Sequence, residues 1–283
     1  MTNKTFMKTI AVPVIILALF TMFISLVKNS VNTRSRRTVE DHEEDLHLMA
    51  TIAGVRNQLS IQLNKARQVI GRMDCEMSKG LTNKHGGWCK TASTETGGQH
   101  LTDKSLIPHL SFLLKGKTVA SFGDGPGAYK REIMKLGQVT LYDAFDGAPY
   151  SEDNSDGNVN FLDLTIPQYG IPLYDWIISL EVAEHIPKEF ESIYLDNIFR
   201  HAKEGIILSW AVPGQGGLQH INNQPLTYVI NVMKKNGFAR NESLSNKLQV
   251  SSSLSWIRSN INVYIRKNFS AFDSERRLVQ WFI

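Results

Sequence analysis

A glycine-rich segment, Gly123-Asp124-Gly125-Pro126-Gly127, follows an apolar run and precedes a helical stretch in this chain of 283 residues. Glycine lacks a Cβ atom and tolerates positive φ, so such a loop can turn tightly and lets a ligand approach the backbone. The following helix would direct free N–H groups and its positive dipole end at an anion. The segment also satisfies G-x-G-x-x-A through Ala128, which is a fingerprint of nicotinamide and flavin nucleotide sites.

Two aspartates follow later apolar runs at positions suited to a nucleoside. Asp143 lies 20 residues after Gly123, at the end of VTLYD, where a carboxylate can accept both hydroxyls of a ribose. Asp163 ends VNFLD, where it could accept from an adenine amino group. Either aspartate could instead serve only in a turn or a helix cap.

The elements that would carry these residues alternate between strand and helix. Short apolar runs predict strands at 118–122, 139–143, 159–163, 175–180 and 205–210, and helices are predicted after the glycine loop, at 188–203 and at 224–236. This alternation indicates βαβ units and a parallel sheet. Ligands of such sheets bind at the carboxyl ends of the strands, which is where the candidate residues are expected.

Four blocks in order, VASFGDGPGAY, LYD, NFLD and YDWIISLEVAEHIP, resemble the motif series of class I S-adenosylmethionine-dependent methyltransferases, specifically the small-molecule type 11 group. The fourth block is the most specific, because Glu181, Glu184 and His185 follow an apolar strand that an aspartate opens. The resemblance covers about residues 100–268. It departs at Asp124 and Pro126, where the family often has a small residue and Thr or Ser.

The resemblance implies an α/β fold with a Rossmann-like, seven-stranded mixed sheet whose last strand runs antiparallel. Residues 260–267, NINVYIRK, fit that last strand, after a hairpin following LQVSSSLSW.

The resemblance also implies S-adenosyl-L-methionine as the cofactor. The residues expected to bind it are Gly123, Asp124, Gly125, Gly127, Asp143, Asp163, Leu164, Leu180 and Glu181. By the family pattern, the glycine loop holds the methionine moiety and Asp143 holds the ribose. Asp163 and Leu164 border the adenine, and the last two residues close over the cofactor.

Two histidines are candidates for the methyl-acceptor side. The cofactor supplies an activated methyl group, so the protein mainly positions the acceptor and excludes water, and a hydroxyl acceptor generally also needs a base. His185 follows the strand at 175–180, and His220 lies in the glycine-rich loop after 205–210. Either is a candidate catalytic base, although in the family the E-H pair commonly shapes its loop. A metal held by both histidines and Glu184 ranks lower, because the spacing matches no zinc signature, and no metal is predicted.

Ahead of this region, residues 10–27 read IAVPVIILALFTMFISLV, 18 positions without a charge. As a helix rising 1.5 Å per residue, the segment spans about 27 Å, near the thickness of a thin bilayer. We predict a single-pass signal anchor in the lipid bilayer rather than a cleaved signal peptide, because no small-x-small site follows. The flanking basic residues do not fix its orientation.

The remaining segments complete the expected organisation. The expected parts are a short tail (1–9), the transmembrane signal anchor (10–27), a helical stem and linker (28–99), the methyltransferase domain (100–268) and a C-terminal tail (269–283). From Val39 to Cys75 apolar residues recur at helical spacing, with Ile52, Leu59, Ala66 and Met73 every seven residues. Such a helix either pairs with another copy in a homo-dimer or packs on its own catalytic domain. The glycines of 78–100 indicate a linker.

Charge and cysteine content limit the partners and the compartment. Six basic residues and no acidic ones precede residue 38, so the rest of the chain carries 25 basic against 27 acidic residues despite the net charge of +4. No nucleic acid partner is therefore expected. Cys75 and Cys89, the only cysteines, are either two free thiols or close a small loop in an oxidising compartment. The anchor and stem lean towards a Golgi or endoplasmic reticulum enzyme with a luminal catalytic domain.

The favoured function is a membrane-anchored S-adenosylmethionine-dependent methyltransferase (EC 2.1.1.-) that methylates a hydroxyl or amine of an unidentified acceptor, such as a glycan or a small molecule. One alternative is a Rossmann-type NAD-dependent oxidoreductase, which the G-x-G-x-x-A pattern and Asp143 favour and the E-x-x-E-H block disfavours. Another is a non-catalytic anchored scaffold with a methyltransferase fold.

Overall fold

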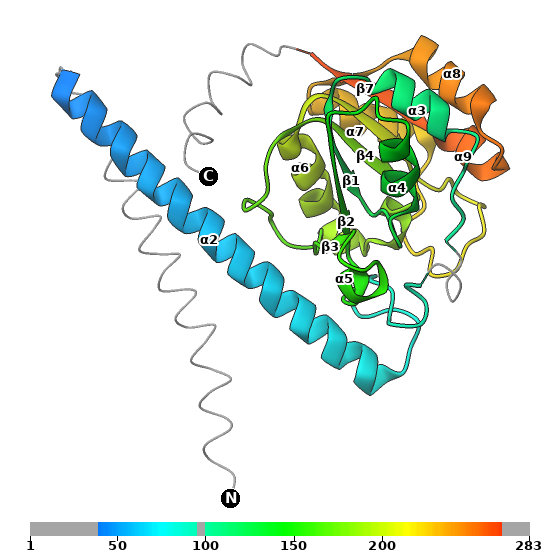
Figure 1. Ribbon diagram of the computed structural model, residues 1–283, viewed down its shortest axis with the longest axis horizontal. Helices are drawn as coiled ribbons and strands as arrows, with labels where there is room; N and C mark the ends of the chain where they lie inside the picture. The colour runs from blue at the N-terminus through cyan, green and yellow to red at the C-terminus, as the bar shows by residue number, and fades with distance from the viewer. Residues whose placement is uncertain (1–38, 95–99, 268–283) are drawn as a thin grey trace, which may run out of the picture. The chain divides into compact units, whose positions relative to one another are not determined.

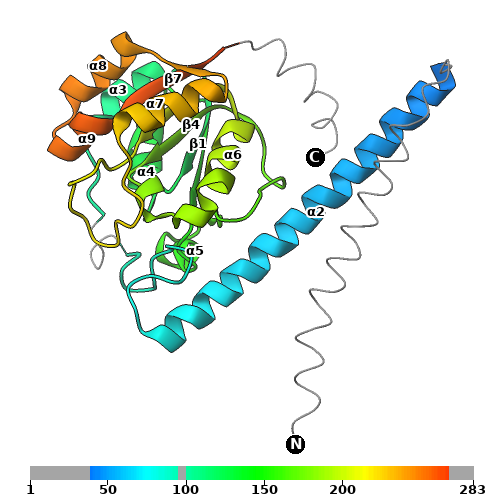
Figure 2. The ribbon, with the colours of Figure 1, turned by 180° about the vertical axis from the view of Figure 1, so that it is seen from behind.

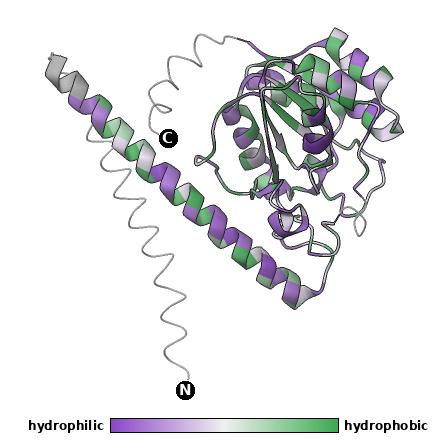
Figure 3. Ribbon diagram, in the orientation of Figure 1, coloured by the Kyte–Doolittle hydropathy of each residue, from purple (hydrophilic) through white to green (hydrophobic). Residues whose placement is uncertain are grey.

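The computed structural model describes residues 39–94 and 100–267, which divide between two compact units, 1–49 and 50–283. The expected anchor at 10–27 and the tails at 1–9 and 269–283 lie outside the described residues. Of the helices that are described, none is long and apolar enough to cross a membrane. Figure 3 shows hydrophilic residues spread along the coloured part of the longest helix, α2 (Val39–Ser78).

A seven-stranded mixed sheet forms the centre of the second unit, in the order β3-β2-β1-β4-β5-β7-β6. The strands are β1 (Thr118–Phe122), β2 (Leu141–Asp146), β3 (Asn160–Phe161), β4 (Tyr174–Leu180), β5 (Ala202–Ser209), β6 (Phe238–Arg240) and β7 (Asn262–Arg266). β1 to β5 pair in parallel, and β7 runs antiparallel to both β5 and β6. The expected mixed sheet with an antiparallel last strand is thus confirmed. The order reverses direction between β1 and β4, the place where ligands bind in open α/β sheets.

Helices cover both faces of this sheet (Figures 1 and 2). They are α3 (Ile107–Leu113), α4 (Ala128–Lys135), α6 (Glu191–His201), α7 (Leu226–Lys235), α8 (Glu242–Ser251) and α9 (Ser255–Asn260). The short helix α5 (Ser151–Asn154) follows β2, and the 3₁₀ turns η1 (Ala183–His185) and η2 (Lys188–Phe190) follow β4. One buried cluster joins α6 and α7 to the sheet, and a second joins α3, α4, α8 and α9 to its other face. Buried on both faces, β4 reads as an almost continuous apolar run, as parallel strands do.

The hairpin expected before the last strand is wrong, because LQVSSSLSW forms the end of α8, a short connection and the start of α9. α8 and α9 separate β6 from β7, and the side chain of Asn241 caps α8 by accepting from the Leu244 N–H. Between the two helices, the buried Asp103 carboxylate accepts from the Ser252 and Ser253 hydroxyls and from the Leu254 N–H. These polar contacts fix the short connection between the two helices.

From residue 50 onwards, α2 packs on the domain that carries the sheet. Asn64 Nδ2 donates to the carbonyl oxygen of Phe161 at 2.9 Å, Arg67 Nε contacts an Asp163 oxygen at 2.7 Å, and Arg72 Nε donates to the carbonyl oxygen of Pro149 at 2.9 Å. Of the two roles expected for the stem helix, packing on its own domain is therefore present in the structure. Apolar side chains also remain exposed on this helix: Val55, Leu59, Leu63, Ile70, Met73 and Met77.

The segment expected to be a linker is a folded loop, residues 79–94, which we call the disulfide loop. A disulfide joins Cys75 in α2 to Cys89, and Thr82 forms a β-bridge with Trp88. The Asn83 side-chain oxygen accepts from two N–H groups of the loop, at 2.9 and 3.0 Å. The covalent link and these hydrogen bonds fix a backbone that its glycines alone would leave loose.

Candidate functional site

A cavity of about 560 Å³ opens where β1, β2 and β4 end. Its walls come from the glycine loop, the ends of these strands, the residues after β3, the disulfide loop and the loop at 215–220. Pockets for small molecules in proteins have volumes of about 300–1,000 Å³. The cavity therefore has the size and the position expected of a ligand site in this fold.

The glycine loop adopts a backbone that side chains would disturb. Gly123, Gly125 and Gly127 have φ of 93°, 57° and 82°, in the left-handed region that favours glycine. A Cβ atom on Gly123 would lie 2.2 Å from Cγ2 of Val182, and one on Gly127 would lie 2.5 Å from Nδ2 of Asn158. The loop is thus closely packed by neighbouring side chains, and its residues 123–126 line the cavity.

Asp124, within this loop, is buried at the start of the turn into α4. One carboxylate oxygen accepts from the Lys130 N–H at 3.2 Å, and the other has no hydrogen-bond partner. Burial, with a smaller contribution from the negative charge of Asp146, raises the pKa of Asp124 to about 7. The charged form of this side chain is therefore costly in the folded protein.

Asp143 does not occupy the strand end at which we expected it. It lies inside β2, opposite Ala120 of β1, and the Tyr174 hydroxyl donates to its Oδ2 at 2.8 Å. Because the apolar run continues through Ala144 and Phe145, the strand ends at Asp146, three residues later. Asp146 lines the cavity and Asp143 does not, so Asp146 is the carboxylate available to a ligand.

Asp146 is braced against the glycine loop. Its Oδ2 accepts from the Gly125 N–H at 2.8 Å, and its Oδ1 accepts from the Ala148 N–H at 2.8 Å. Each carboxylate oxygen has two acceptor positions, so these bonds leave one free on each oxygen. The arrangement suits a ligand with two neighbouring hydroxyl groups.

Asp163 and Leu164 also line the cavity. Asp163 Oδ1 accepts from the Thr165 N–H at 2.8 Å and from its hydroxyl at 2.6 Å, while Oδ2 lies 2.7 Å from Arg67 Nε. Arg67, which also lines the cavity, was not identified from the sequence. It lies 96 residues from Asp163, and nothing in the local pattern of the stem helix indicates this contact.

Leu180 and Glu181, where β4 ends, also line the cavity. Glu181 has φ of 54°, which is uncommon for a residue with a side chain and costs conformational energy. Its backbone N–H donates to the Ser209 hydroxyl at 2.8 Å, and its carboxylate accepts from Gln215 Nε2 at 2.7 Å and Asn260 Nδ2 at 3.0 Å. Three hydrogen bonds from separate elements hold this strained residue in place.

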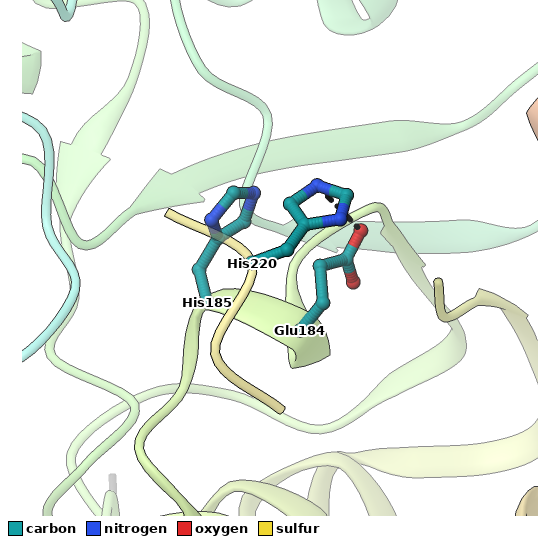
Figure 4. A group of neighbouring side chains, drawn as sticks. All are labelled: Glu184, His185 and His220. Atoms are coloured by element: carbon teal, nitrogen blue, oxygen red, sulfur yellow. Dashed lines mark ion pairs between the residues drawn. The ribbon is translucent and has the colours of Figure 1, made fainter. Parts of the chain in front are cut away.

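The two candidate histidines lie together, with ring centroids 5.0 Å apart (Figure 4). His185 follows β4, and its Nδ1 lies 3.1 Å from the carbonyl oxygen of Gln219. Burial and then the neighbouring His220 lower the pKa of His185 to about 4, so its ring is neutral at pH 7. Both rings line the cavity.

Glu184 lies beside these rings and is fully buried, at 0% exposure. One carboxylate oxygen is 3.9 Å from His220 Nε2, and neither oxygen has a hydrogen-bond partner. Burial, and next the negative charge of Glu181, raise the pKa of Glu184 well above its ordinary value.

Aromatic side chains of the disulfide loop complete this part of the cavity. The Trp88 ring lies 5.7 Å from that of His185, nearly edge-on, and His85 also lines the cavity. These residues were missed because the segment was interpreted as a linker. The cysteines at 75 and 89 were the only signal in the sequence that this segment folds back.

No protein-family model and no curated protein sequence matches the chain. Solved structures do match. Magnesium protoporphyrin IX methyltransferase from Synechocystis PCC 6803, with bound SAH, is 18% identical with a TM-score of 0.43, over 57% of this chain and 82% of that chain. The methyltransferase domain of bacterial CtHen1 is 13% identical with a TM-score of 0.43, over 57% and 96%. The N-methyltransferase NodS from Bradyrhizobium japonicum WM9 is 11% identical with a TM-score of 0.41, over 57% and 83%.

Proposed function

We propose that the chain is an S-adenosylmethionine-dependent methyltransferase (EC 2.1.1.-) that methylates a hydroxyl or amine. One observation carries this proposal: the glycine loop, Asp146, Asp163 and Glu181 line a single cavity at the strand ends. These are the four regions that the motif series leads us to expect around the cofactor, with Asp146 in the role we had predicted for Asp143.

The residues of the cavity fit such a nucleoside. The free acceptor positions of Asp146 suit the two ribose hydroxyls, and Leu164 with Asp163 offers an apolar and a polar edge for the adenine. Because Arg67 and Thr165 already engage Asp163, only one acceptor position, on Oδ2, is left for an amino group. The glycine loop and Leu180 would hold the methionine moiety.

The acceptor would lie beside His185 and His220. The bound cofactor supplies a sulfonium methyl group for in-line displacement. The chain therefore has to orient the acceptor, exclude water and remove the proton of the acceptor. Both histidines line the cavity and lie next to the buried Glu184. We therefore propose that this cluster takes up the proton that a hydroxyl acceptor loses.

The membrane anchor at residues 10–27 and a luminal catalytic domain are part of the proposal. The Cys75–Cys89 disulfide supports an oxidising compartment, because disulfides are rare in proteins of the cytosol. The exposed apolar side chains of α2 support a homo-dimer through the stem, as the heptad spacing first suggested.

Calorimetric titration of the full chain in detergent with S-adenosylhomocysteine, the product form of the cofactor, tests the function. We expect one site per chain and no binding of NAD. Binding of NAD instead would favour the oxidoreductase, and binding of neither would favour the scaffold. The titration needs the residues before 95, because Arg67 and Trp88 line the cavity.

Replacing Gly217 by alanine should slow methyl transfer. A Cβ atom on Gly217 would lie 2.1 Å from His220 Nε2, so the ring must move, whereas a Cβ atom on Gly216 meets nothing within 4 Å. We expect Gly217→Ala to lower the rate at least about 10-fold and to leave the cofactor affinity within twofold. The reason is that displacing the His220 ring impairs the chemical step but not the binding of the cofactor. Transfer of label from the cofactor to fractionated cell extract measures the rate. Gly216→Ala is the matched control, and an equal loss in both variants would rule out this role of His220.

A further inference from the structure

Glu184, His185 and His220 converge on one point from two different loops. Each offers one ligand atom, and these atoms all lie within 4.8 Å of one another (Figure 4). Glu184 comes from the 3₁₀ turn η1, and His220 comes from the loop after β5. The N–H groups of Ile221 and Asn222 donate to the Glu184 carbonyl oxygen at 2.9 and 3.0 Å, which fixes the two loops together.

The buried polar atoms of this cluster lack partners. Both Glu184 carboxylate oxygens and His220 Nδ1 are buried without a hydrogen bond. Such atoms are uncommon in folded proteins, because each one gives up its hydrogen bonds to water and gains none in return. Their presence at one place indicates a missing binding partner.

The three groups do not satisfy one another. Glu184 Oε1 and His220 Nε2 are 3.9 Å apart, too far for a hydrogen bond. A cation with ligand bonds of about 2.1 Å keeps its ligand atoms about 3–4 Å apart. The spacing therefore suits ligands of one cation, with a contraction of less than about 1 Å at the widest pair.

The orientation of His185 agrees with this role. With Nδ1–H donated to the Gln219 carbonyl oxygen, its Nε2 lone pair is left for another partner. A metal-bound histidine usually donates its other N–H to a carbonyl or carboxylate oxygen in this way, which fixes the tautomer and the ring. Glu181 does not belong to the group whose ligand atoms lie within 4.8 Å of one another, and its carboxylate oxygens accept instead from Gln215 and Asn260.

We propose that Glu184, His185 and His220 bind one divalent transition-metal ion, whose remaining coordination positions face the cavity. Two imidazoles and one carboxylate suit ions such as Mn²⁺, Fe²⁺, Co²⁺ and Zn²⁺. This proposal departs from our expectation of no metal, which followed from spacing along the chain alone.

The role of the ion rests on the proposed function, although binding of the ion does not. An acceptor oxygen that occupied an open position would be held near the cofactor, and the positive charge would lower its pKa. The histidines would then act as ligands rather than as the base, and the acceptor would be a hydroxyl rather than an amine.

The test uses the full chain in detergent, without a polyhistidine tag and stripped of metal by EDTA. Titration with Mn²⁺, Co²⁺ or Zn²⁺ should give one site per chain, and pulsed EPR of the Mn²⁺ complex should show directly bound imidazole nitrogen. Glu184→Gln and His220→Gln should each weaken binding at least about 100-fold. The exposed residues Glu189 and His109 provide matched controls, and Glu189→Gln and His109→Gln should bind as the unchanged chain does.

Three results would overturn the proposal: no stoichiometric binding by the folded chain, unchanged binding in Glu184→Gln and His220→Gln, or a Mn²⁺ spectrum without nitrogen. If Glu184→Gln fails to fold, the spectrum of the unchanged chain and His220→Gln still decide. Titration with S-adenosylhomocysteine in EDTA is a separate measurement. A chain that binds metal but not the nucleoside contradicts the proposed function alone, and the converse contradicts the metal site alone.

Discussion

Asp146→Asn is expected to weaken binding of S-adenosylhomocysteine about 100-fold, whereas Asp143→Asn should leave it within twofold. The Asp146 carboxylate lies at the end of β2 and lines the cavity, with one free acceptor position on each oxygen. A hydrogen bond to a charged group contributes about 1.5–3 kcal/mol, and a 100-fold change corresponds to about 2.7 kcal/mol. Asp143 instead accepts from Tyr174 within the strand.

Titration calorimetry of the two variants checks this result, with circular dichroism to confirm that both fold. Asparagine retains one acceptor oxygen, so it keeps one of the two backbone hydrogen bonds that Asp146 makes to Gly125 and Ala148. A large loss in Asp143→Asn with none in Asp146→Asn would restore our original assignment of the ribose site. Equal affinities in both variants would place the nucleoside elsewhere.

Asp124→Asn should stabilise the folded protein at pH 8 by up to about 4 kcal/mol and should change its stability much less at pH 4. Burial raises the pKa of Asp124 to about 7, whereas an aspartate in an unfolded chain titrates near 3.9. Between these pH values the folded state binds the extra proton, so this group makes the protein less stable as pH rises, up to about pH 7. Each pKa unit corresponds to about 1.36 kcal/mol.

Denaturant unfolding of both proteins at pH 4, 5.5 and 8 measures this difference. Asparagine does not titrate, and its side-chain oxygen can still accept from the Lys130 N–H, so the folded structure is kept. The gain should grow through this range and then level off above pH 7. A difference that is the same at all three pH values would show that Asp124 ionises as easily in the folded state as in the unfolded one.

Local pattern predicted the sheet well and the strand ends less well. β1 was predicted at 118–122, as the structure has it, because the glycine loop marks its end. β2 was ended too early at Asp143, because a polar residue inside a buried strand resembles a strand end when its partner is unknown. That partner, the Tyr174 hydroxyl, lies 31 residues away. The error placed the predicted ribose carboxylate three residues too early, so Asp146 was missed.

Contacts between segments far apart in the sequence could not be predicted from local sequence patterns. The stem helix was predicted, but its contact between Arg67 and Asp163 joins residues that share no local signal. The glycines of the disulfide loop indicated a flexible linker, and only the pairing of Cys75 with Cys89 makes this loop a wall of the cavity. His185 and His220 were both identified, but their meeting with the buried Glu184 depends on how two loops pack.

The disulfide ties the end of α2 to the segment that carries Trp88, so one covalent bond connects the stem to the wall of the cavity. Reducing agents would break this disulfide, and only hydrogen bonds would then hold the disulfide loop in place. Production of the active protein consequently belongs in the bacterial periplasm or a eukaryotic secretory host, and dithiothreitol should be kept out of every purification buffer.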